Sequence, residues 1–62
     1  MTDESISSMD PFMLLSMINM KLRDFYGSLS SLCEDLNITK SLVEKRLEEA
    51  GFAYIAEINQ FK

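Results

Sequence analysis

The sequence predicts a mainly α-helical domain of three helices, ending in either a short β-hairpin or an extended tail. Apolar residues recur at helical spacing between residues 11 and 50, and helix-starting and helix-ending residues frame each of these stretches. The last eleven residues instead show pairs of apolar or aromatic residues two positions apart, which is typical of short strands. The chain of 62 residues is short enough for one domain. We therefore expect a flexible tail over residues 1–9 and a single domain over residues 10–62.

The first helix is predicted to begin at Asp10-Pro11, because Asp is a favoured N-cap and Pro fits the first helical position. Gly27 marks its end. Residues 1–9 are mostly polar, with Ile6 as their one internal apolar residue, and this composition indicates a mobile tail. At about 100° per residue, the residues on the core side of the helix are expected to be Leu14, Leu15, Ile18, Leu22, Phe25 and Tyr26.

Two further helices are predicted between Ser28 and Gly51. Ser28 is a natural N-cap, Asn37 tolerates the left-handed conformation of a turn, and Thr39 can cap the next helix. The inward residues of the second helix are Leu29, Leu32, Cys33 and Leu36, and those of the third are Val43, Leu47 and Ala50. Two short helices joined in this way are typical of the helix-turn-helix, and a following hairpin would make the domain winged-helix-like.

The C-terminal segment "FAYIAEINQFK" carries the strand prediction. Phe52 and Tyr54, and again Asn59 and Phe61, alternate with the period of a strand. The predicted turn between them contains no Gly, Pro or Asn-Gly pair. The amide groups of Asn59 and Gln60, like the Arg23 guanidinium, could either fix the tail onto the helices or contact a ligand.

A helix-turn-helix raises the question of nucleic-acid binding, which the charges of this chain disfavour. The net charge is -4 and the pI is about 4.5. The outward side of the third helix offers one base against three acids, and phosphates would be repelled there. We therefore keep nucleic-acid binding as the alternative, with a predicted face made of Thr39, Lys40, Ser41 and Lys45.

The sequence offers little for catalysis, metal binding or membrane insertion. It has no His, a single Cys33 and no Gly-rich phosphate loop, so we predict no enzyme, no metal and no cofactor. Cys33 lies on an inward stripe, where a small core residue is expected. The longest apolar runs are too short to cross a bilayer and the start is acidic. These features, with the lone thiol, favour a cytoplasmic protein.

A methionine stripe on the first helix is the predicted interaction surface. Met13, Met17 and Met20 repeat at i, i+4 and i+7, nearly opposite the core side, and Arg23 and Asp24 lie at its rim. Methionine surfaces adapt to partners, so we predict a protein partner or a homodimer. The alternative is cover from within the chain, either by the N-terminal tail through Ile6 and Met9 or by the C-terminal segment through Ile55, Ile58 and Phe61.

The segments "DPFMLLSMINMKLRDFYGSL", "LCEDL" and "INQF" together resemble a small bacterial family of unknown function. The resemblance covers Asp10 to Phe61, and its recurring motifs are DPxMLLS, KLRD and the C-terminal NQF. This chain departs at Phe52, where the family pattern has Tyr. The resemblance implies no activity, cofactor or catalytic residue. It places Met13 in the shared pattern and leaves Met17 and Met20 outside it, so the expected function is that of an uncharacterised, non-catalytic interaction module.

Overall fold

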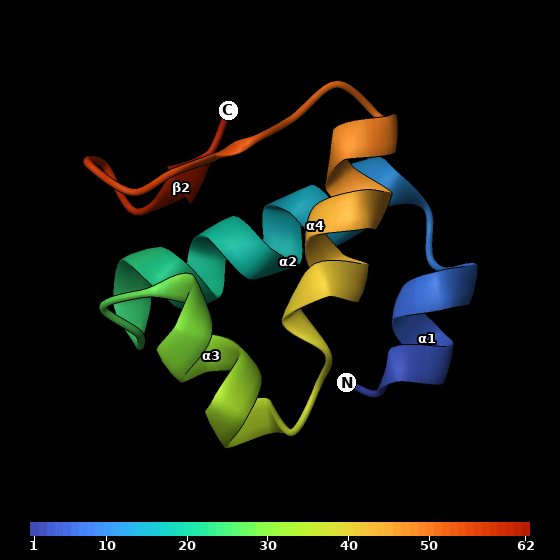
Figure 1. Ribbon diagram of the computed structural model, residues 1–62, viewed down its shortest axis with the longest axis horizontal. Helices are drawn as coiled ribbons and strands as arrows, with labels where there is room; N and C mark the ends of the chain where they lie inside the picture. Colours follow the sequence, from blue (N-terminus) through green and yellow to red (C-terminus); the bar gives the residue numbers. More distant parts are fainter.

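The computed structural model describes all 62 residues and contains four helices and a two-stranded hairpin, one helix more than the sequence predicted. In chain order the elements are α1 (Asp3–Ser8), α2 (Pro11–Asp24), α3 (Leu29–Leu36), α4 (Lys40–Glu49), β1 (Tyr54–Ile55) and β2 (Gln60–Phe61). Figure 1 shows α2 crossing the middle of the molecule, with α1 beyond α4 on one side and the hairpin on the other. The expectation of a mainly helical domain with a short C-terminal hairpin is confirmed.

The N-terminal residues, predicted as a flexible tail, instead form α1. Thr2 caps this helix, and its hydroxyl and the Ser5 hydroxyl bond each other's backbone N–H groups in a capping box. Ile6 is fully buried and joins the main core. The burial of Ile6 and the hydrogen bonds of the N-cap stabilise this helix despite the polar composition from which a tail was predicted.

Helix α2 begins as predicted and ends slightly earlier than its apolar pattern suggested. The Asp10 carboxylate accepts hydrogen bonds from the backbone N–H groups of Phe12 and Met13, at 3.1 and 3.2 Å. The helix ends at Asp24 with Phe25 as its C-cap. Phe25 was expected on the core side, yet it is 72% exposed, because the chain has left helical geometry there and the projection of 100° per residue no longer applies.

The turn between α3 and α4 follows the predicted capping residues. The Ser28 hydroxyl accepts a hydrogen bond from the Ser31 N–H, and Asn37 adopts the left-handed conformation with φ of 55°. Thr39 occupies the N-cap position of α4, but its hydroxyl does not bond the first turn of that helix. It donates instead to the Asp3 carboxylate of α1.

The chain leaves α4 through a Schellman motif at Gly51 and Phe52. Gly51 has φ of 94°, a conformation that other residues adopt only with strain. The Phe52 N–H donates to the Leu47 carbonyl at 2.9 Å and the Gly51 N–H to the Glu48 carbonyl at 3.0 Å, which is the hydrogen-bond pair of this motif. Phe52 then packs edge-on against Phe12 of α2, with ring centroids 5.9 Å apart.

The hairpin pairs Tyr54 with Phe61 and Ile55 with Gln60 in an antiparallel register. Its four-residue connection contains no Gly, and the left-handed position needed to reverse the chain is taken by Asn59, with φ of 53°. Asn is the residue type other than Gly that adopts this conformation most readily. The alternation in the sequence therefore predicted the hairpin, although Phe52 and Asn59 lie outside its strands. The left-handed turn position is taken by an Asn without a following Gly.

The amides left without a role by the sequence fasten this hairpin to α2. The Asn59 amide nitrogen donates to the Leu22 carbonyl at 3.0 Å and to the Tyr26 carbonyl at 2.9 Å. Gln60 donates to the Asn19 carbonyl at 3.0 Å. The Asn19 side chain bonds both the N–H and the carbonyl of Phe61, as a neighbouring strand would. Asn59 and Gln60 thus donate to backbone carbonyls of α2 and of the segment after it. Of the two roles that the sequence allowed, they have the one of fixing the tail onto the helices.

The core is formed by one cluster of buried residues, none of which is polar or charged. All four helices and β2 contribute to it: Ile6, Leu14, Ile18, Leu22, Leu29, Leu32, Cys33, Ile38, Val43, Leu47 and Phe61. No buried side-chain nitrogen or oxygen lacks a hydrogen-bond partner. None of the helices combines the length and the hydrophobicity required to cross a membrane.

Candidate functional site

Three of the six large apolar side chains that are exposed lie on α2, and the others are Phe25, which follows this helix, and Ile55 and Ile58 of the hairpin. Phe12 and Met13 are each 60% exposed and Met20 is 44% exposed, while Met17 between them is half-buried. We call these four residues the Met face. Three of them were predicted from the sequence, and Phe12 was not. At about 100° per residue, position 12 projects about 80° from Met20 and about 140° from Met17, on the flank where Phe12 contacts Phe52, so helical spacing did not group it with the methionines.

The orientation of the Met face follows from how α2 is held. Leu14, Ile18 and Leu22 are almost completely buried against the other helices. The hairpin lies along one flank of α2, where Asn19 bonds Phe61. With its core side and one flank occupied, α2 can turn the Met face only outward. Sequence periodicity predicts the core side, but the flank taken by the hairpin depends on contacts between residues 42 positions apart.

The structure also decides between an open stripe and one covered from within the chain. Ile6 and Phe61, two of the residues proposed as internal cover, are buried in the core and do not cover the methionines. Ile55 and Ile58 of the hairpin remain exposed themselves. Met9 packs against the core cluster at the link between α1 and α2. Met13 and Met20 are consequently left open to solvent.

The predicted rim residues Arg23 and Asp24 form an ion pair with each other on the surface. The Arg23 Nε and Nη2 atoms donate to the two carboxylate oxygens of Asp24 at 2.9 and 3.1 Å. The hydrogen bond and the charge of the partner raise the pKa of Arg23, and the hydrogen bond from Arg23 lowers the pKa of Asp24. Both groups therefore stay charged at neutral pH, at the C-terminal end of α2.

The four residues of the alternative nucleic-acid face are all exposed, but two of them already have partners. Thr39 donates from its backbone N–H and its hydroxyl to the Asp3 carboxylate, at 2.7 and 2.5 Å. These bonds lower the pKa of Asp3. Lys40 donates from Nζ to the Ser30 hydroxyl at 3.2 Å. Ser41 and Lys45 lie in the same helix and face solvent. The Asp3 carboxylate thus occupies the start of α4, the end of a helix that favours negative charge.

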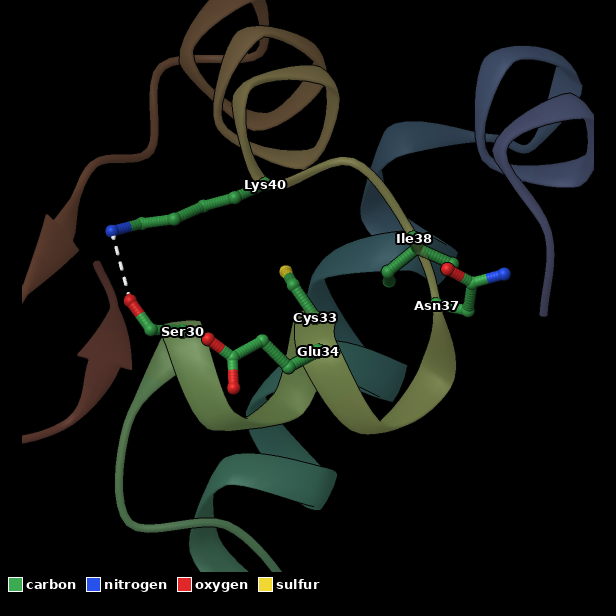
Figure 2. Close-up of a pocket in the computed structure, with 6 residues that line it drawn as sticks. All are labelled: Ser30, Cys33, Glu34, Asn37, Ile38 and Lys40. Atoms are coloured by element: carbon green, nitrogen blue, oxygen red, sulfur yellow. Dashed lines mark hydrogen bonds between the residues drawn. The ribbon is translucent and has the colours of Figure 1, made fainter.

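An open pocket of about 350 Å³ lies between α3 and the start of α4. Figure 2 shows the Cys33 sulfur pointing into it, with Lys40 reaching across to Ser30 and the Asn37 amide turned away. Burial raises the pKa of the Cys33 thiol, against the opposing effect of the Lys40 charge. A thiol whose pKa is raised remains protonated at neutral pH and is a poor nucleophile. The prediction that Cys33 is a small core residue agrees with its burial.

A second polar cluster lies on the other side of α3, where the Tyr26 hydroxyl donates to the Asp35 carboxylate at 2.5 Å. This hydrogen bond, followed by burial and the carboxylate charge, raises the pKa of Tyr26. The tyrosine therefore keeps its proton and serves as a donor that holds the end of α2 near α3. Tyr26 was expected on the core side, and it is half-buried against the core cluster.

These features define a small helical domain closed by a C-terminal hairpin, with exposed methionines on the outer side of α2. The chain matches the family Domain of unknown function (DUF4250) over residues 8–61. Because the match spans most of the chain, the protein belongs to this family. The matched range includes α2, α3, α4 and the hairpin, and leaves out most of α1. Comparisons with curated proteins and with solved structures gave no match.

Proposed function

We propose that this protein is a non-catalytic, cytoplasmic protein-interaction module whose binding surface is the Met face. The observation that carries the proposal is that Met13 and Met20 are both exposed on the outer side of α2 and that neither terminal segment covers them. In so small a protein, an exposed apolar surface rimmed by charged residues is the usual sign of a protein-binding site.

The energetics of burial support the same choice of surface. Removing apolar area from water contributes roughly 25 cal/mol per Å², and methionine side chains adjust their shape to a partner at little cost. The Arg23–Asp24 pair at the end of the Met face supplies charged groups at its rim, where they can remain solvated when the apolar centre is covered.

Site-specific photocrosslinking in cells tests this proposal. A photoreactive amino acid at position 20 is expected to yield discrete adducts with protein, because its side chain would lie within an interface. The control carries the same amino acid at position 45, an exposed site on α4. Equal or absent labelling at the two positions would count against an interaction surface on α2.

The alternative function, nucleic-acid binding, rests on the proposal that α3, α4 and the hairpin that follows them form a helix-turn-helix-like and winged-helix-like arrangement. Fold alone does not establish function, and the Asp3 carboxylate at Thr39 opposes phosphate binding. The alternative predicts salt-dependent retention on DNA that Lys45→Glu weakens. Absence of retention at low salt would remove it.

A further inference from the structure

The occupant of the Met face can be specified further, an inference that rests on the proposed function. We propose that the face binds a second copy of this chain, with the two α2 helices antiparallel and related by a two-fold axis near Ser16 and Met17. Three observations carry this: the charge balance of α2, the positions of its charged groups relative to the methionines, and the size of the molecule.

Helix α2 is a neutral region of an acidic protein. Between residues 10 and 24, Asp10 and Asp24 are balanced by Lys21 and Arg23, whereas the whole chain carries a net charge of -4. The acidic excess is carried by α1, with Asp3 and Glu4, and by α3, with Glu34 and Asp35, while α4 is neutral like α2. Two copies that meet through α2 avoid the repulsion that a pairing through α1 or α3 would meet.

The spacing of residues on α2 fits an antiparallel pair in a single register. If Met13 of one copy lies opposite Met20 of the other, the same register brings Asp10 opposite Arg23, because both pairs are centred between Ser16 and Met17. Projected at about 100° per residue, Asp10 and Arg23 also fall on opposite sides of the methionines. A two-fold axis requires this diagonal placement, since each contact must occur twice.

A parallel arrangement lacks these advantages. It would place Asp10 of one chain beside Asp10 of the other and Arg23 beside Arg23, so that like charges meet. It would also align the two helix dipoles in the same direction. The antiparallel arrangement instead brings Arg23, whose Nε and Nη2 atoms already bond Asp24, to the helix start of the partner, where its remaining N–H groups face the capping carboxylate of Asp10. Ser16, a small residue near the axis, allows the two helices to approach closely.

The size of the chain explains why a second copy would be useful to it. A standard interface buries about 800 Å² per partner, which would be about a fifth of the 3830 Å² that this chain exposes. A domain of this length buries only about 60% of the surface that its unfolded chain exposes. Burying the Met face against a second copy would add to the apolar area that this small domain removes from water.

Cysteine crosslinking of the full chain tests the register. Met13→Cys and Met20→Cys are expected to form a mixed disulfide dimer when the two variants are combined, and little dimer when each is oxidised alone. In the proposed register, like positions lie about 10 Å apart along the helix axis. Met17→Cys, beside the axis, is expected to link to itself. Wild type, with only the buried Cys33, is the control. Efficient self-linking of all three variants would indicate parallel helices and overturn the proposal.

Sedimentation of the uncrosslinked protein gives an independent readout. Met20→Asp is expected to weaken the dimer at least tenfold, with unchanged helical content by circular dichroism, and Arg23→Glu to weaken it about two- to fivefold. Lys45→Glu, the same charge change on α4, should leave the dimer unaffected. A wild type that stays monomeric at millimolar concentration overturns pairing of two copies. If photocrosslinking at position 20 then yields an adduct with a different protein, the proposed function stands and only this inference fails.

Discussion

Helices α2 and α4 present similar residues to the core and different residues to solvent. Each contributes fully buried aliphatic side chains, Leu14 and Ile18 from α2 and Val43 and Leu47 from α4. On its solvent side α2 carries methionine and phenylalanine, whereas α4 carries Ser41, Lys45 and several glutamates. The buried residues of the two helices have the same role in the fold. The two helices therefore differ in what they can bind because their exposed residues differ.

The two helices are also flanked by different terminal segments. The hairpin is fixed beside α2 by the neutral amides of Asn19, Asn59 and Gln60. Helix α1 is fixed beside α4 by charged groups: Asp3 bonds Thr39, and Arg46 donates to the Ile6 carbonyl at 3.3 Å and to the Met9 carbonyl at 2.7 Å. Both segments leave Met13 and Met20 exposed, and only the one beside α4 contacts the start of its helix.

The largest expected effect on the free energy of unfolding comes from the buried side of α2, and substitutions on its exposed side should have little effect. Ile18→Ala removes a fully buried side chain, and we expect it to lower the free energy of unfolding by about 2–5 kcal/mol. Met20→Ala on the opposite side is expected to change it by no more than about 0.5 kcal/mol in dilute, monomeric protein. Urea unfolding of the two variants measures the difference. Similar losses in both would mean that the Met face is part of the monomer's packing.

The next effect concerns the hairpin beside α2. Asn59→Ala leaves the Leu22 and Tyr26 carbonyls without their donor and forces Ala into a left-handed conformation. We expect a loss of about 1–3 kcal/mol in the free energy of unfolding. Asn59→Gly, which keeps the backbone conformation and removes only the amide, separates the two causes. If Asn59→Gly matches wild type in urea unfolding, the amide bonds do not hold the hairpin in place.

How much could be predicted from the sequence differs between these regions for a physical reason. The caps at Asp10, Ser28 and Gly51 and the inward stripes depend on neighbours within one helical turn, so local patterns predict them. Helix α1 was missed because Ile6 is stabilised by distant residues, including α4, and no local pattern records that contact. The roles of Asn59 and Gln60 were left open because their acceptors lie more than 30 positions away along the chain.

In the candidate site, too, some features follow from local sequence patterns and others depend on residues far apart in the chain. Met13, Met17 and Met20 follow from helical spacing alone, so their place on one side of α2 could be predicted. Whether another part of the chain covers them depends on where Ile6 and Phe61 pack, which only the tertiary structure shows. The engagement of Thr39 by Asp3 joins residues 36 positions apart, and it changes the chemistry of a surface that the sequence presented as free.

The smallest expected effect concerns the contact between α1 and α4, and it depends on pH. Hydrogen bonds from the hydroxyl and backbone N–H of Thr39 lower the pKa of Asp3 below its ordinary value of 3.8. A carboxyl group whose pKa is lower in the folded state contributes stability that is fully present above the unfolded value and is lost as the pH falls through the folded value. Wild type should therefore lose this contribution below about pH 4.

Asp3→Asn is expected to lower the melting temperature at neutral pH and to flatten its decline between pH 4 and pH 2. The neighbouring Glu4 provides the control, because Glu4→Gln removes the same charge from the same turn of α1 while its exposed side chain leaves the Thr39 contact intact. Thermal unfolding followed by circular dichroism at each pH measures both variants. Equal pH profiles for Asp3→Asn and Glu4→Gln would show that the charge near the start of α1 matters and that its bond to α4 does not. A lower melting temperature at neutral pH and a flatter decline in acid for Asp3→Asn alone would show that an acidic group from α1 holds the start of α4.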